Sequence, residues 1–354
     1  MMKKCLTTAL IICQILIIAG CDKVSDPATS ISSIKTYQDI PGVTGEEITA
    51  MEAIIGARRS FSYGQMSETE AFILPDGTYD GFTARLCELL SNLFGIEFTL
   101  ELYDLKTLQD GFENGTIDFS GDFSPTPENT RRYLMTRPIA ERSLRVFQYE
   151  KSADILTEND LIGLRIGSLA GTLNISQINE YYSELEFFDI PVDSYDAAAQ
   201  MLRSGEIDVF VADATIDQLM DDYGFIKSKE LFSLIYTPVS MSTANTELEP
   251  VINVVNKYLA AGGIDILFNL YKDGNNAYER YKFINSLSDK ERAYLTGLTK
   301  QNTAVKLAFE WDNYPISFYN ETDKEFQGIA IDVLSAIGEL TGLKIGRASC
   351  RERV

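Results

Sequence analysis

A short motif that occurs twice limits the folds open to this chain. Residues 112–119 read Phe-Glu-Asn-Gly-Thr-Ile-Asp-Phe, and residues 202–209 read Leu-Arg-Ser-Gly-Glu-Ile-Asp-Val. In both segments Gly-x-Ile-Asp ends an apolar stretch with helical spacing and begins a strand. Such repeats indicate the architecture before any single residue does. We expect two similar α/β lobes within one folded unit.

A longer repeat relates residues 81–98 to residues 328–344. In each segment a glycine and a large apolar residue precede a helix-like run, which a second glycine follows. The repeat predicts that a second copy of the folded unit begins near Val305 and is cut off, so that residues 304–344 hold only its first part.

Composition excludes several classes of function. The chain has 354 residues, enough for two ordinary domains, and a formal net charge of −21. Nucleic-acid binding is disfavoured, because phosphate neutralisation requires clustered Lys and Arg. Histidine is absent, which excludes Ser-His-Asp and Cys-His catalysis and a histidine-based zinc site within this chain. We predict no metal site, no cofactor and no enzymatic activity.

The N-terminus predicts export. Lys3 and Lys4 precede an apolar run over residues 9–19, which ends in Ile-Ala-Gly-Cys at residues 18–21. This sequence looks like a bacterial lipobox, in which Cys21 would carry lipid after residues 1–21 are processed as a signal peptide. An ordinary cleaved signal and an uncleaved anchor are the alternatives. All three interpretations place the protein outside the cytoplasm. The lipobox and the uncleaved anchor would also attach it to the membrane.

The remaining segments follow from composition. Residues 22–48, rich in Ser, Thr and Asp, are predicted to be a tether. Residues 49–278 form the first unit, with lobe 1 over about 49–147 and 240–278 and lobe 2 over about 148–239. Residues 279–303 are expected to be a helical linker. Residues 345–354 are abruptly basic and look like one reading frame of a sequencing adapter, and Cys87 is predicted to be a buried core thiol.

Strands alternate with helices in both halves of the first unit, which is typical of α/β folds. Five short stretches follow one another along this unit: Pro75-Asp76-Gly77 with Gly81-Phe82, Gly115 to Asp118, Thr126-Pro127-Glu128, Gly167 with Gly171-Thr172, and Gly205 to Asp208 with Ala212-Asp213. In this order and spacing they resemble the family 3 extracellular solute-binding proteins. The resemblance implies a bilobal, type II periplasmic-binding-protein-like ("Venus flytrap") fold that binds a small polar, amino-acid-like solute.

The tandem arrangement is similar to the extracytoplasmic regions of sensor histidine kinases and diguanylate cyclases. The resemblance therefore implies the ligand-sensing region of a membrane signalling protein, joined to a downstream transmembrane helix and a fused signalling domain. The alternative is a lipid-anchored substrate-binding protein of an ABC amino-acid importer, with a permease as partner. An enzyme is a third class, and it would require Glu70 or Glu128 to be a cleft acid.

The resemblance also implies a set of ligand-binding residues. Gly171 and Thr172 match a turn that donates backbone N–H groups to a ligand carboxylate. Asp213 matches an acid that accepts from the ligand ammonium, and its position at the end of an apolar strand suits ligand binding in open α/β sheets. Capping of the following helix is the alternative role for Asp213. Tyr63 and Phe72 are candidates for an aromatic wall.

The residue expected to bind the ligand carboxylate departs from the family pattern. Spacing from Thr126 places the family's arginine at position 129, which is Asn129 here. Arg131 and Arg132 follow within one helical turn and are candidates to replace it, because a guanidinium group suits two carboxylate oxygens. Asp122, after the strand that begins at Ile117, and Thr126 itself are further candidates for ligand binding.

Overall fold

The computed structural model describes residue 31, residues 33–301 and residues 304–347. The predicted signal peptide with Cys21, and residues 348–354 of the suspected adapter tail, lie outside the described residues. Residues 345–347 of that tail form a short strand, β15 (Ile345–Arg347), which pairs in parallel with β11 (Val305–Leu307).

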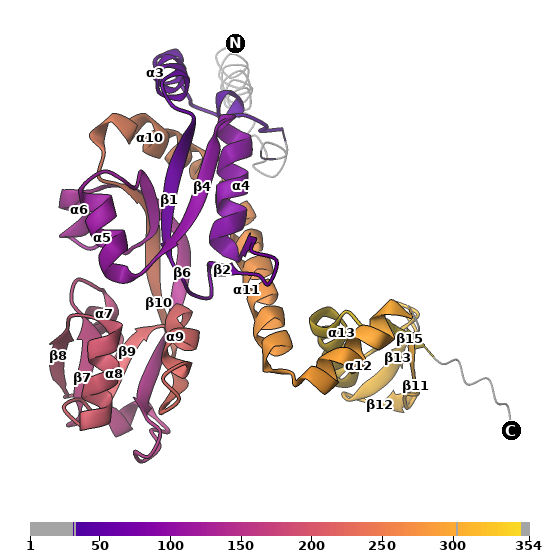
Figure 1. The fold of residues 1–354 in the computed structure, drawn as a ribbon. Coiled ribbons are helices and arrows are strands. Elements are labelled where there is room, and N and C mark those ends of the chain that lie inside the picture. Colours follow the sequence, from indigo (N-terminus) through magenta and orange to yellow (C-terminus); the bar gives the residue numbers. More distant parts are fainter. Residues whose placement is uncertain (1–30, 32, 302–303, 348–354) are drawn as a thin grey trace, which may run out of the picture.

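The main sheet has eight strands in the order β4-β1-β5-β10-β6-β9-β7-β8. Its strands are β1 (Ser60–Met66), β4 (Glu97–Tyr103), β5 (Phe119–Phe123), β6 (Leu134–Tyr149), β7 (Arg165–Leu169), β8 (Phe188–Val192), β9 (Val209–Asp213) and β10 (Ile226–Thr243). β6 and β10 are antiparallel and pair from Thr243–Leu134 to Ile226–Tyr149. The parallel strands on either side of them belong to different lobes, so β6 and β10 pass through both (Figure 1). The predicted two-lobed α/β architecture is confirmed.

Helices cover both lobes and continue beyond them. Lobe 1 has α3 (Gly45–Gly56), α4 (Phe82–Phe94), α5 (Leu105–Glu113), α6 (Asn129–Arg132), α10 (Glu249–Tyr258) and α11 (Ile264–Ser286), with the small β2 (Phe72–Ile73) and β3 (Tyr79–Asp80) pair. Lobe 2 has α7 (Asn174–Tyr181), α8 (Tyr195–Ser204) and α9 (Asp217–Asp221). Beyond α11 lie α12 (Asp289–Lys300), β12 (Asp312–Asn313), β13 (Ser317–Asn320), β14 (Glu325–Gln327) and α13 (Ile329–Thr341).

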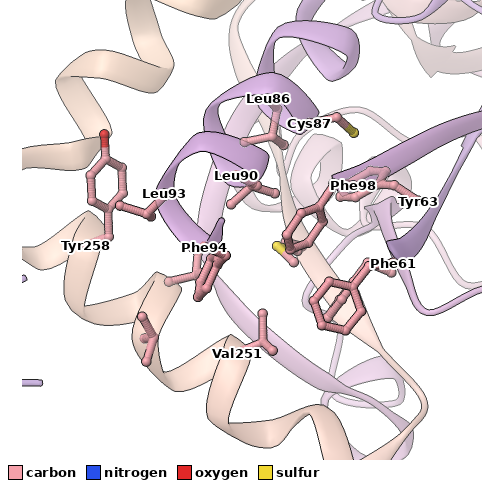
Figure 2. Packing of buried hydrophobic residues seen from close by; sticks show 14 of the residues in the cluster. Phe61, Tyr63, Leu86, Cys87, Leu90, Leu93, Phe94, Phe98, Val251 and Tyr258 are labelled. Atoms are coloured by element: carbon pink, nitrogen blue, oxygen red, sulfur yellow. The ribbon is translucent and has the colours of Figure 1, made fainter. Parts of the chain in front are cut away.

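The core of lobe 1 is built on aromatic contacts between α4 and the sheet. Phe94, at the end of α4, packs against Phe98 of β4, which packs in turn against Phe61 of β1 (Figure 2). The ring centroids of Phe61 and Phe98 are 5.0 Å apart. Cys87 is buried among them, as predicted. The helical run Thr246–Ser286 is apolar and long enough to cross a membrane, but 44% of its most apolar window is buried within the protein.

The predicted tether is shorter than residues 22–48. Tyr37 stacks on Phe94 with ring centroids 5.7 Å apart, and Ile40 is buried in the same core. A capping box at Thr44 begins α3, and Glu47 forms an ion pair with Lys257 at 2.5 Å. The prediction failed because a few apolar side chains within a polar stretch were sufficient to anchor it to lobe 1.

The Gly-x-Ile-Asp motif has the same structural role in both lobes. Ile117 and Ile207 are buried and contact the backbone of Gly64 and Gly167, where a Cβ atom would collide with them. The motif carboxylates then fix the neighbouring strand: Asp118 accepts from the Ser62 N–H at 3.0 Å, and Asp208 accepts from the Arg165 N–H at 2.8 Å. The repeat therefore sets equivalent strand pairings in the two lobes.

The longer repeat is matched in backbone geometry. Gly81 and Gly328 precede α4 and α13 with φ of 111° and 120°. A Cβ atom at either position would collide with a backbone carbonyl, that of Glu70 or that of Ile316. The same carbonyls accept from Thr83 N and Ala330 N, both at 2.9 Å. Each helix then ends at a left-handed glycine, with φ of 67° and 70°.

Candidate functional site

A cleft of about 380 Å³ lies where the two lobes meet at the hinge strands. A volume of this size suits a small organic ligand. Lobe 1 lines it from the ends of β1 and β5 and from α5 and α6. Lobe 2 lines it from the β7–α7 turn, the β8–α8 turn and the end of β9. Both lobes therefore contribute to one cavity at the carboxyl ends of their parallel strands, which is where open α/β sheets bind ligands.

Arg142, on β6, is a charged residue that lines the cleft. Its side chain is 5% exposed and donates two hydrogen bonds to Glu70, from Nε at 3.0 Å and from a terminal nitrogen at 2.6 Å. The terminal nitrogen also contacts Glu68 at 3.1 Å and Asp122 at 3.0 Å. One buried cation is thus shared by three carboxylates, a geometry in which charge-assisted hydrogen bonds are strong.

Local structure holds the carboxylates in place. Glu68 and Ala71 form an isolated β-bridge that turns the chain after β1, so that Glu68 and Glu70 both face inward. Asp122 on β5 accepts from the Met66 N–H at 2.8 Å and from the Gln65 side chain. The cluster therefore connects β1, β5 and β6, and it fixes the positions of the strand ends that line the cleft.

Burial and charge change the pKa values in this cluster. Burial raises the pKa of Glu68 well above its usual value, and the nearby carboxylates of Asp122 and Glu70 add to the effect against the attraction of Arg142. Burial alone would lower the pKa of Arg142, but Glu70, Glu68 and Asp122 together raise it, and the guanidinium group stays charged.

Asp213 lies opposite the cluster, at the last position of β9. Its Oδ2 is 3.7 Å from Arg142, and its buried Oδ1 has no hydrogen-bond partner among the described residues. Burial raises the pKa of Asp213 to about 6, partly offset by Arg142. The alternative role as a helix cap is not realised, because the side chain makes no capping hydrogen bond to the following turn.

One wall of the cleft combines aromatic rings with α6. Phe123 and Tyr133 both line the cavity and lie with ring centroids 5.2 Å apart. Arg132 stacks over the Tyr133 ring at 5.4 Å and donates to Glu113 at 2.6 Å. Tyr195, at the start of α8, lines the lobe 2 side.

Five of the predicted ligand-binding residues line the cleft: Asp122, Arg132, Gly171, Thr172 and Asp213. Their role in binding stays a prediction. Thr126 is buried behind the lining, where its Oγ1 accepts from the Asn129 N–H at 3.0 Å. Arg131 is exposed outside the cavity, since the single turn of α6 directs Arg132 inward instead.

The predicted aromatic wall is placed elsewhere. Tyr63 is fully buried within the lobe 1 core, and Phe72 packs against Tyr278 and Tyr281 of α11, with ring centroids 5.3 and 4.8 Å away. Strand spacing shows that an aromatic residue points inward, but it does not show whether the ring enters the core or the cleft. Of the rings that do line the cleft, Phe123 ends β5, Tyr133 follows α6 and Tyr195 begins α8.

Sequence reasoning also missed Arg142. Residues 142, 144 and 146 of β6 share one face of the sheet, and Leu144 and Val146 are fully buried. An arginine in step with two buried apolar residues is a sign of a buried ion pair, because an unpaired charge there would be costly. That signal was present in the sequence, although its partners Glu68 and Glu70 lie more than seventy residues away.

A second cavity of about 710 Å³ lies between α11 and α13. It is larger than the interlobe cleft, but its charged lining includes Asp80 and Arg85, which pair with each other. It has no counterpart to the Arg142 cluster or to Asp213. We therefore regard the interlobe cleft as the candidate site.

Solved structures with partial similarity to this chain include several binding proteins. An ancestral arginine-binding protein bound to arginine has a TM-score of 0.44 and 18% identity, over 60% of this chain and 98% of that chain. The substrate-binding protein AbpA of an amino acid ABC transporter from Streptococcus pneumoniae, bound to L-arginine, has a TM-score of 0.47 and 14% identity, over 64% and 98%. The arginine-bound form of truncated ArgBP from T. maritima has a TM-score of 0.44 and 18% identity, over 59% of this chain and 98% of that chain.

No protein-family model matches the chain, and no curated protein matches it. The two-lobed architecture stated above rests on the strand order of the sheet itself.

Proposed function

We propose that residues 49–278 form a solute-binding module of the family 3 type, which binds a small polar solute outside the cytoplasm by closure of its lobes. The observation that carries the proposal is the interlobe cleft, which both lobes line at the hinge strands β6 and β10. Hinge strands that pass through both lobes allow rigid-body closure around a ligand. The Thr69 N–H donates to the Thr215 carbonyl at 3.1 Å across the lobes, a contact that closure would favour.

Binding is favoured over catalysis by the state of the carboxylates. A cleft acid would need a carboxyl group free to exchange a proton with a substrate. Glu70 instead accepts two hydrogen bonds from Arg142, and Glu128 is exposed at the rim, 3.7 Å from Arg132. Glu70 therefore lacks this freedom, and Glu128 lies at the solvent-exposed rim rather than in a buried site.

We further propose that the module senses its ligand and transmits closure to a second copy of the unit at residues 304–344. Helix α11 extends past lobe 1, lies beside α9 of lobe 2 and leads to α12 and the segment beyond (Figure 1). Tyr278 donates to Gln218 at 3.3 Å, and Lys282 lies 3.3 Å from Asp221. Movement of lobe 2 would therefore change the contacts of the helix that leads to the next unit.

The importer alternative assigns the same binding module to an ABC permease. Under both alternatives the protein is held at the membrane, by lipid at Cys21 or by a downstream transmembrane helix. Sequencing the gene beyond the codon for Lys344 would separate them. A kinase or cyclase domain would contradict the importer, and a stop codon after one more module would contradict the sensor.

Solute binding is tested with the chain from Asp22 onward by thermal-shift screening against amino acids, amines, sugars and organic acids. We expect at least one solute to raise the melting temperature, since ligands that bind only the folded state stabilise it. Small-angle scattering should then show a smaller radius of gyration with that solute. The absence of any shift across the whole set would contradict the proposed function.

A further inference from the structure

The lining of the interlobe cleft has a strong excess of negative charge. Five lining residues carry carboxylates and two carry guanidinium groups, which gives the lining a formal charge of −3. The carboxylates are those of Glu113, Asp122, Glu128, Asp193 and Asp213, and the guanidinium groups are those of Arg132 and Arg142. A cleft lined mainly by one sign of charge concentrates ligands of the opposite sign.

Both guanidinium groups already have carboxylate partners. Arg142 donates to three carboxylates within 3.1 Å through Nε and Nη2, and its Nη1 lies 3.7 Å from Asp213. Arg132 donates to Glu113 at 2.6 Å and lies 3.7 Å from Glu128. A ligand carboxylate that approached either group would meet the carboxylates that already surround it, and the repulsion between like charges opposes its binding.

Two other residues that could bind a carboxylate have their donors occupied. The side-chain amide of Asn129 donates to the Ser124 carbonyl at 2.9 Å. Both the N–H and the hydroxyl of Thr172 donate to the Leu169 carbonyl, at 3.4 and 2.9 Å. The turn before α7 therefore directs these donors back into the protein rather than into the cleft.

Acceptors and aromatic rings, in contrast, remain available for a cation. Asp213 makes no hydrogen bond through Oδ1 and only a 3.7 Å contact through Oδ2, and a buried carboxylate without donors is costly until a donor arrives. Phe123, Tyr133 and Tyr195 line the same cavity. Aromatic faces attract ammonium and guanidinium groups, most strongly when these are desolvated.

We propose that the cleft selects an organic cation, an ammonium or guanidinium compound that has no carboxylate. The inference deepens the proposed function and depends on it. The cationic head would bind Asp213 and the aromatic rings. The remainder of the ligand would lie against the lobe 1 side of the cleft, where the lining carboxylates are Glu113, Asp122 and Glu128. An organic cation fits better than a metal ion, because no group of three metal-ligating side chains in residues 31, 33–301 and 304–347 is arranged to hold one.

Two matched ligand pairs test the inference by isothermal titration calorimetry on the chain from Asp22 onward. Agmatine differs from arginine, and cadaverine from lysine, only by the missing carboxylate. We expect the member without the carboxylate to bind at least about ten-fold more tightly in at least one pair, because juxtaposed like charges oppose binding. Asp213→Asn should lower the affinity for that member at least about ten-fold, whereas Glu180→Gln, on the exposed face of α7, should leave it unchanged.

The outcomes separate this inference from the proposed function. If neither pair shows this preference for the member without the carboxylate, or if only neutral or acidic solutes bind, the inference is wrong and the proposed function stands. If no solute binds, both are wrong. Should Asp213→Asn fail to fold, the comparison of the pairs on the unmodified chain still decides.

Discussion

Arg142→Met would remove the cation that Glu68, Glu70 and Asp122 share. The arginine side chain is 5% exposed and lies 2.6–3.1 Å from these carboxylates. Removing one partner of a buried ion pair costs about 3–5 kcal/mol, because the remaining charges stay buried without compensation. We therefore expect the free energy of unfolding to fall by about this amount near neutral pH. Methionine fills much of the vacated volume, so the loss reports charge rather than a cavity.

The pH dependence distinguishes an electrostatic loss from a packing loss. Without Arg142, the ionised carboxylates repel one another in the folded state, and protonating them relieves the repulsion. The deficit of the variant should therefore be larger at neutral pH than at acid pH. Urea unfolding followed by circular dichroism at both pH values measures it.

A matched control lies on the same strand. Arg145 is 30% exposed and lies 3.7 Å from Asp217, so Arg145→Met should cost no more than about 1 kcal/mol. The reasoning is refuted if Arg142→Met costs as little as Arg145→Met, or if its deficit does not change with pH. Either result would mean that the buried cluster does not need its cation.

Three further predictions follow from the cleft, the repeat and the interlobe contact. The affinity for agmatine should rise about ten-fold between about pH 5 and pH 7.5, because burial raises the pKa of Asp213 to about 6. The groups that face Asp213 are Arg142, Glu70, Asp122 and Tyr195. Calorimetry measures the rise, and Asp213→Asn should show none. The same raised pKa means that, without ligand, Asp213 contributes stability at acid pH that is lost as the pH rises through about 6. Gly81→Ala should lower the free energy of unfolding by about 2 kcal/mol or more, since the φ of Gly81 is positive and a Cβ atom would collide with the Glu70 carbonyl. Gly77→Ala, also at positive φ but in open space, should cost about 1 kcal/mol. Equal melting temperatures of the two variants would contradict this. Lys282→Ala should increase the mean distance between spin labels on α9 and α11 at low salt. The difference between the variant and the unmodified chain should vanish at about 1 M salt, because the ion pair with Asp221 is exposed and screened. An unchanged distance at low salt would show that this contact does not transmit closure to α11.

The sequence predicted those features that depend on local backbone chemistry. Gly-x-Ile-Asp marked strand entry because its isoleucine must be buried and its aspartate accepts from the neighbouring strand. Gly81 and Gly328 were recognisable because only glycine tolerates their backbone conformation and the close carbonyl. Asp213 was found because an acid that ends an apolar strand stands out in a single sequence.

Long-range pairing was not predictable in the same way. Arg142 meets Glu70 across 72 residues of chain, and strand spacing gives the side on which a residue lies but not its partner. The same limit explains Tyr63 and Phe72, which point inward but into packed protein. Residues 36–48 looked like a tether because the net composition hides the two side chains, Tyr37 and Ile40, that anchor them.

Hydrogen–deuterium exchange of the chain from Asp22 onward, with and without agmatine, tests most directly whether the interlobe cleft is the solute site. We predict protection in the segments that line it from both lobes, residues 105–133 of lobe 1 and residues 169–172, 192–195 and 213 of lobe 2. Protection confined to the second cavity, at residues 276–285 and 336–340, would contradict the account, as would protection in one lobe alone.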